Sequence, residues 1–144
     1  MLMTLLLSLL MVQTGQTSPP TPQAPAEDAK KALEKIQGSW QVVSFNGQEL
    51  PSGAEAYLVF KGDKYEQWTG TTVDERGTVK LDPSTKPASI DLMIAEGQDA
   101  GKLQLGLMDL TGETLSLAFA EPGNPVRPKA PGDAALIAIL EKSK

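Results

Sequence analysis

The stretch from Leu103 to Phe119, LQLGLMDLTGETLSLAF, indicates the fold of this chain most directly. Its apolar residues alternate with polar or small ones on both sides of Thr111-Gly112, a pair that is typical of a tight turn. A period of two predicts two antiparallel strands joined as a hairpin, over Leu103–Leu110 and Glu113–Phe119. We expect the leucines and Phe119 to form an apolar inner face, and the residues between them a mixed outer face.

The same pattern continues through most of the chain. Turn residues separate further β-rich runs, which are Trp40–Phe45, Tyr57–Lys61, Tyr65–Thr69, Gly77–Leu81, Ser89–Ile94 and Ala135–Leu140. Short strands with no helix between them favour an all-β, antiparallel up-and-down barrel of about eight strands. The last run is apolar throughout and fits a helix equally well, but we favour a strand because Gly132-Asp133 precedes it and the barrel needs a closing partner.

One short helix is expected before the first strand. Over Ala26–Gln37 the apolar residues Ala29, Leu33 and Ile36 share one face, and Gly38 follows as a residue suited to end a helix. A helix of this length is marginal alone, so we expect its apolar stripe to dock on the barrel.

The first 25 residues differ from the rest because none of them is charged. The apolar run Leu2–Val12 is about half as long as the roughly 20 residues that span a membrane, and it fits the hydrophobic region of a secretory signal peptide. We therefore predict a signal peptide over residues 1–18, a proline-rich tether over residues 19–25 and one domain over residues 26–144, exported to the periplasm or outside the cell. The alternative is a disordered tail on a cytoplasmic protein.

The amino-acid composition excludes several classes of function. The 144 residues include no Cys and no His, which excludes disulfides, thiolate zinc sites and Ser-His-Asp catalysis. The 13 basic and 18 acidic residues give a net charge of −5, the wrong sign for binding a phosphate backbone. We predict a protein that is not an enzyme, with no cofactor, metal, nucleic-acid partner or stable membrane span. Carboxylate chemistry at Asp82 and Asp91 is the remaining catalytic alternative.

Four ordered blocks of sequence carry a family likeness. Gly38-Ser39-Trp40 resembles the Gly-x-Trp signature of lipocalins. Together with Leu58–Tyr65, Leu81–Leu92 and Arg127-Pro128, it resembles a small lipocalin-like domain family that is common in planctomycete bacteria. The resemblance implies a barrel, frequent export and no established activity. The chain departs from the family pattern at Gly106-Leu107-Met108 and at Lys129-Ala130-Pro131, where relatives carry aromatic residues.

The resemblance also suggests site residues. It implies that Trp40 plugs one end of the barrel, with Arg127 lying across its ring. From the strand positions themselves, we expect Tyr57, Tyr65 and Trp68 to come close together, and with Met108 they are the candidate residues for binding a small apolar ligand. The alternative is that these side chains only pack, in a filled barrel that acts as a structural or protein-interaction module on a partner in the cell envelope.

Overall fold

The computed structural model describes the backbone of residues 23–143 and the side chains of residues 27–143. This part of the chain forms one α-helix, one short 3-10 helix and a series of strands. The elements are α1 (Gln23–Lys35), β1 (Gly38–Phe45), β2 (Gln48–Glu49), β3 (Ala56–Lys61), β4 (Lys64–Thr69), β5 (Thr72–Asp82), β6 (Ala88–Glu96), β7 (Leu103–Thr111), β8 (Thr114–Phe119), η2 (Pro131–Asp133) and β9 (Leu136–Lys142).

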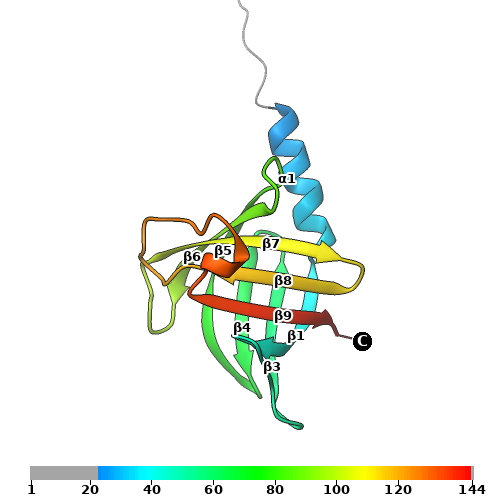
Figure 1. Cartoon of the computed structure of the whole chain (residues 1–144), viewed down its shortest axis with the longest axis vertical. Helices are drawn as coiled ribbons and strands as arrows, with labels where there is room; N and C mark the ends of the chain where they lie inside the picture. Colours follow the sequence, from blue (N-terminus) through cyan, green and yellow to red (C-terminus); the bar gives the residue numbers. More distant parts are fainter. Residues whose placement is uncertain (1–22, 144) are drawn as a thin grey trace, which may run out of the picture.

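The strands form a closed antiparallel barrel (Figure 1). Each strand from β3 to β9 pairs with the next one along the chain, and β1 closes the ring because it pairs with both β3 and β9. The two-residue β2 pairs only with Ser44 and Phe45, at the end of β1. The barrel therefore has eight strands, which confirms the predicted fold class. The run of ambiguous period near the C-terminus is β9, the closing strand.

Helix α1 begins earlier than predicted, at Gln23 rather than Ala26, and ends at Lys35. It thus includes the last three residues of the predicted tether, and Pro25 lies in the first turn, where a missing N–H breaks no helical hydrogen bond. The predicted signal peptide, and the tether up to residue 22, lie outside the described residues.

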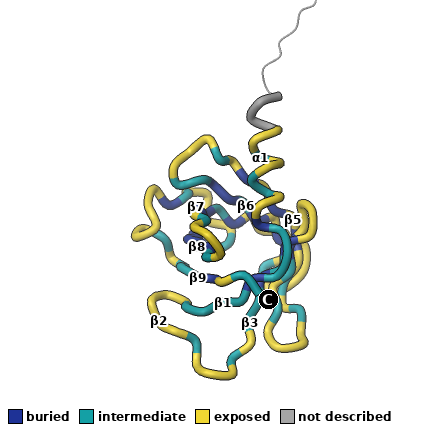
Figure 2. Tube along the Cα trace, turned by 90° about the vertical axis from the view of Figure 1, so that its right-hand side faces the viewer, coloured by how far each residue is buried: buried dark blue, intermediate teal, exposed yellow. Residues whose placement is uncertain are grey.

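The barrel has one end next to α1 and one end away from it, here called the closed end and the open end. The fully buried side chains Ile36 and Trp40 lie at the closed end, where α1 meets β1. There the Gln37 amide also hydrogen-bonds both backbone groups of Gly62, in the β3–β4 turn. Figure 2 shows exposed loops, among them the segment around β2, at the end farthest from α1. Because β1 runs away from α1 and β3 returns, residues 45–56 border the open end.

The interior is lined largely by the residues that alternation predicts. Ile90, Leu92 and Ile94 of β6 are buried, as are Leu115 and Leu117 of β8. All of these except Ile94 belong, with Phe60, Tyr65, Leu81 and Leu140, to a single core that extends from α1 into the barrel.

Strand β7 is turned the other way round from the prediction. Gln104, Gly106 and Met108 face the interior, while Leu105 and Leu107 lie on the outer face. The physical reason is the Phe119 ring of β8, because a Cβ on Gly106 would lie 2.3 Å from its Cδ1 atom. Only glycine leaves room for that ring, so the register places Gly106 inside and the leucines outside.

Candidate functional site

The open half of the barrel holds a cavity of about 450 Å³. Its wall is mainly aliphatic and aromatic, with contributions from β1, β3, β4, β6, β7, β8 and β9 and from Leu50. The polar side chains that point into it are uncharged, and none of its lining residues is Asp, Glu, Lys or Arg. The lining residues are Val42, Phe45, Leu50, Ala56, Tyr57, Leu58, Gln67, Trp68, Thr69, Leu92, Gln104, Leu117, Phe119, Leu136, Ala138 and Leu140.

Two polar residues of the wall are held in fixed orientations. Gln104 is buried and donates a hydrogen bond from Nε2 to the Ala120 carbonyl oxygen, at 3.0 Å. Thr69 donates its hydroxyl hydrogen bond to the carboxylate of Asp74. Sequence reasoning missed Gln104, although one signal was present: it is the only strongly polar side chain on the face of β7 that also carries Gly106 and Met108.

The predicted aromatic cluster is divided by the barrel wall. Tyr65 points inward and is buried, whereas Tyr57 and Trp68 are cross-strand partners whose side chains lie on the outer face. Both residues are nonetheless among those that line the cavity, together with their neighbours on β3 and β4. On the outside, Tyr57 and Trp68 border a small groove of about 190 Å³. Met108 faces the interior, but it packs in the core and is not among the lining residues of the cavity.

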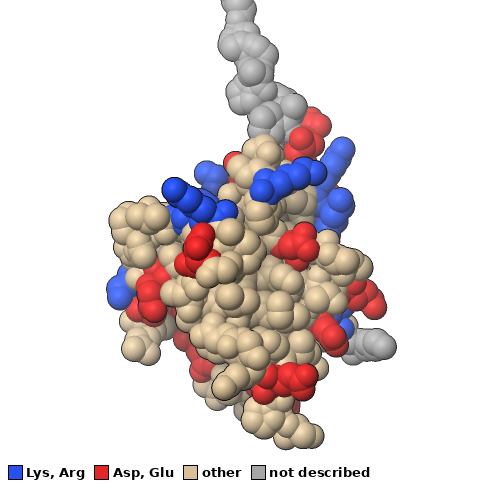
Figure 3. All heavy atoms as spheres, viewed as in Figure 1, with Lys and Arg blue, Asp and Glu red and all other residues tan. Residues whose placement is uncertain are grey.

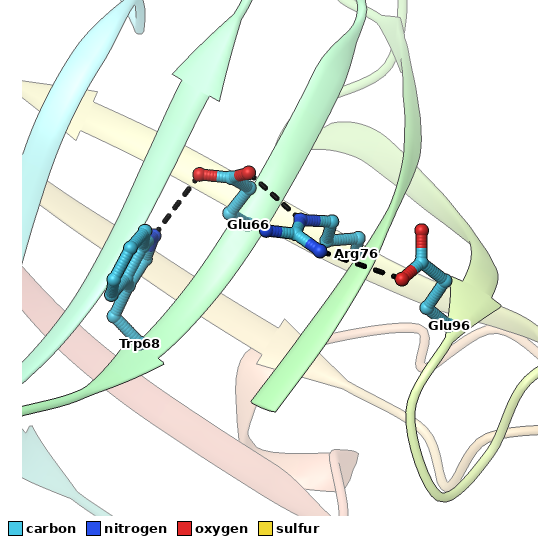
Figure 4. A network of polar contacts seen from close by, with 4 residues as sticks. All are labelled: Glu66, Trp68, Arg76 and Glu96. Carbon is cyan, nitrogen blue, oxygen red and sulfur yellow. Dashed lines mark hydrogen bonds and ion pairs between the residues drawn. The ribbon is translucent and has the colours of Figure 1, made fainter. Parts of the chain in front are cut away.

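Trp68 belongs to a chain of polar contacts on the outer surface (Figure 4). Its Nε1 donates to Glu66, at 3.1 Å, and the other oxygen of Glu66 pairs with Arg76, at 2.9 Å. Arg76 also reaches Glu96 on β6, at 3.4 Å. The guanidinium of Arg76, followed by the indole N–H of Trp68, holds the pKa of Glu66 below its ordinary value. Since each member already has a partner, this network joins β4, β5 and β6 rather than offering free groups to a ligand.

Inside the barrel wall, Tyr65 donates its hydroxyl hydrogen bond to Glu75 of β5, at 2.8 Å. Burial raises the pKa of Glu75 above its ordinary value, and the nearby charge of Asp99 adds to this rise, while the hydrogen bond from Tyr65 partly opposes it. Burial, followed by the adjacent Glu75, also raises the pKa of Tyr65 far above the usual range of a phenol. The pair is therefore a neutral phenol that donates to a half-buried carboxyl group.

This pair predicts a pH dependence of stability. Because the pKa of Glu75 is raised on folding, the folded protein binds more protons than the unfolded chain from about pH 4.5 upward, so the free energy of unfolding falls as pH rises through the raised pKa. Glu75→Gln keeps an oxygen that accepts from Tyr65 and carries no charge. We expect the variant to lack this fall and to be more stable than the wild type at neutral pH, as measured by urea unfolding over a pH series.

The matched control is Glu66→Gln on the outer face. Because the pKa of Glu66 is lowered on folding, its charged form contributes stability at neutral pH, so this variant gains none there. Parallel pH profiles for the wild type and Glu75→Gln contradict the prediction.

The predicted contact between Arg127 and Trp40 is corrected by the structure. Trp40 is buried at the closed end, but the cation over its ring is Lys142, whose Nζ lies 4.9 Å from the ring centroid. Lys142 is the last residue of β9, and it also donates to the Gln37 carbonyl oxygen. The closing strand thus brings its own terminal lysine over Trp40, which sequence spacing alone does not reveal.

Arg127 instead fastens the long β8–β9 connection to the outer wall. Its Nη2 lies 2.7 Å from Asp91 Oδ1, and its Nη1 donates to the carbonyl oxygens of Gly106, at 2.8 Å, and Ile90, at 3.3 Å. Asp91 is thereby used in a structural ion pair. Asp82, the other carboxylate considered for catalysis, accepts the Ser84 backbone N–H at 3.0 Å and shapes the β5–β6 turn.

The outer face of β7, β8 and β9 carries a second, shallow hollow of about 510 Å³. Leu107, Ala118, Ile137 and Ile139 form its floor, and Pro131 of η2 stands beside it, since η2 packs on β8 (Figure 1). Most of this face is uncharged in Figure 3. Of the outward leucines of β7, Leu107 is almost fully buried here.

Compared with known proteins, the chain matches no family model, no curated protein and no solved structure. The resemblance to the lipocalin-like family therefore stays a prediction, with which the eight-stranded barrel agrees. None of the helices in the described part of the chain has the length and apolar character needed to cross a membrane. Residues 23–143 contain no group of three or more carboxylate, imidazole or thiol side chains placed to hold a metal ion.

Proposed function

We propose that this protein binds a small, largely apolar and uncharged molecule in the open half of its barrel. The observation that carries the proposal is the cavity of about 450 Å³, whose lining includes no charged residue. Pockets for small molecules typically measure about 300–1,000 Å³ and combine apolar walls with a few placed polar groups. Gln67, Thr69 and Gln104 are those polar groups here.

The two ends of the barrel support the same proposal. Ile36, Trp40 and Leu115 are almost completely buried, so the closed end is filled with side chains. At the open end Phe45 lines the cavity while 44% of its surface is exposed, so the aromatic ring meets both the cavity and solvent. A ligand would therefore enter past Phe45 and stop on the packed core. A filled barrel that acts only through its surface is the alternative, and the cavity favours binding over it.

We extend the proposal to the location of the protein. In this proposal the barrel acts in the periplasm or outside the cell, and residues 1–18 are a signal peptide. The support for export is the uncharged, apolar run Leu2–Val12, whose length suits such a peptide.

The binding proposal predicts saturable uptake of a neutral apolar fluorophore. We expect N-phenylnaphthylamine to bind the purified domain at one site, with an increase in its fluorescence on leaving water. Ala138→Trp places an indole into the cavity from β9 and should abolish this binding. Ala95→Trp is the matched control, because Ala95 lies exposed on β6, and it should bind like the wild type.

A second cavity-filling variant keeps the test valid if Ala138→Trp does not fold. Ala56→Trp fills the cavity from a different strand, β3, which β1 separates from β9. Circular dichroism checks that each variant keeps its strands. Native mass spectrometry of the wild type should show the complex with one fluorophore. Absence of saturable binding to the wild type, or unchanged binding to folded Ala138→Trp and Ala56→Trp, overturns the proposed function.

A further inference from the structure

Gln104 has an unambiguous orientation in the cavity wall. Its amide side chain faces the Ala120 carbonyl oxygen at 3.0 Å. A carbonyl oxygen only accepts hydrogen bonds, so the amide group directed at it must be the NH₂ and not the oxygen. The carbonyl Oε1 of Gln104 therefore points away from Ala120.

That oxygen has no donor from the described part of the protein, and it keeps some accessible surface. Gln104 is 6% exposed and lines the cavity beside Leu92 and Phe119. Within residues 27–143, no hydrogen-bond donor reaches its Oε1 atom, since the only hydrogen bond of the side chain is the one from Nε2. Water can reach this oxygen in the free protein, but an apolar ligand that covered it would bury it without a partner, which is unfavourable.

We propose that the ligand carries a hydroxyl or N–H donor, which forms a hydrogen bond to Oε1 of Gln104. This inference rests on the proposed function and names the class of ligand more closely. An apolar molecule with one such donor fits both parts of the wall, because its body meets the apolar side chains and its donor satisfies the amide oxygen. Gln104 is then the residue that determines specificity.

The charges at the open end indicate which charge the proposed ligand carries. No cationic side chain lines the cavity, so a carboxylate head group would find no counter-ion there. Three exposed acids, Glu49, Glu55 and Asp74, lie on the segments that border the open end, and Asp74 accepts the hydroxyl of the lining residue Thr69. Like charges at an entrance disfavour a partner of the same sign. The ligand is therefore a molecule with a neutral donor, such as an alcohol, and not a fatty acid.

Three probes of similar size test this inference by displacing N-phenylnaphthylamine from the wild-type protein. Undecanol has a donor, its isomer decyl methyl ether has none, and undecanoate carries a negative charge. We expect undecanol to bind about tenfold more tightly than the ether, the ratio that one hydrogen bond supplies, and undecanoate to bind most weakly. Gln104→Met should bind alcohol and ether equally while it keeps the affinity of the wild type for the ether.

Gln67→Met is the matched control, because Gln67 also lines the cavity but lies exposed at its mouth. It should keep the preference for the alcohol. Equal binding of undecanol and ether to the wild type overturns the inference even though the proposed function stands, and so does a preference that survives in Gln104→Met or disappears in Gln67→Met. If neither the fluorophore nor any of the three probes binds, the proposed function itself fails. The comparison on the wild type does not depend on the folding of any variant.

Discussion

Replacing Trp40 by alanine should lower the free energy of unfolding by about 3–5 kcal/mol, the range found when a large aromatic side chain is removed from a core. Trp40 is 2% exposed and belongs to the core where α1 meets the barrel. Its Nε1 donates to the Ile36 carbonyl oxygen at 2.8 Å, and Lys142 lies over its ring. The substitution therefore removes packing, leaves a buried carbonyl without its donor and takes away the aromatic partner of the closing strand.

Two further variants separate these contributions. Trp40→Phe keeps a ring beneath Lys142 but loses the hydrogen bond to Ile36, so we expect a loss of about 1–3 kcal/mol. Trp68→Ala removes the other tryptophan, which lies half-buried on the outer face, and should cost about 1 kcal/mol. Urea unfolding followed by far-UV circular dichroism measures all three without using tryptophan fluorescence. If Trp40→Ala is no more destabilising than Trp68→Ala, Trp40 does not close the barrel.

The strands themselves could be predicted from the sequence because they depend on local patterns. Alternation in Leu103–Phe119, and a turn residue after each run, require only neighbouring residues to agree. The antiparallel barrel then follows from connections too short to hold a crossover helix. The start of β5 was missed for the same reason, since Asp74, Glu75 and Arg76 hide its alternation behind three consecutive charges.

The orientation of β7 and the partner of Trp40 depended on residues outside the strand concerned and could not be predicted. Which side of β7 points inward is decided by the Phe119 ring, which requires the missing side chain of Gly106. The cation over Trp40 comes from Lys142, which closure of the ring brings to β1. Neither relation leaves a periodic signal, because the first depends on which side chain lies opposite Gly106 in the β7–β8 hairpin, and the second arises only when the first and last strands have met.

The candidate site shows the same division. Its apolar character was predicted, but its position in the open half follows from volumes summed across the barrel. Small residues such as Ala56 and Ala138 face that half, whereas Trp40 and Tyr65 fill the other. Gln104 is a candidate ligand-binding residue because its Nε2 donates to the Ala120 carbonyl oxygen, and that contact fixes where its own oxygen points. The sequence thus predicts a class of site, and the register places Gln104, the residue proposed to give it specificity, in the cavity wall.

Replacing Gly77 by alanine should be about as destabilising as overpacking a core allows, with a loss of about 3 kcal/mol in the free energy of unfolding. A Cβ on Gly77 would lie 2.1 Å from the Met93 carbonyl oxygen and 2.8 Å from Cε1 of Tyr65. The first of these atoms belongs to the backbone of β6, and it cannot move away without disturbing the ladder between β5 and β6. The second belongs to the ring whose hydroxyl group holds Glu75.

Gly132→Ala is the matched control for this prediction. Gly132 lies in η2, and a Cβ there would meet no atom within 4 Å, so the same chemical change should alter the stability by less than about 0.5 kcal/mol. Urea unfolding of the two variants and the wild type provides the comparison. Equal midpoints for Gly77→Ala and Gly132→Ala would show that β5 and β6 can separate at this point. The backbone of β5 and β6 would then be deformable beside Tyr65, because these two paired strands would have moved apart to accommodate one methyl group.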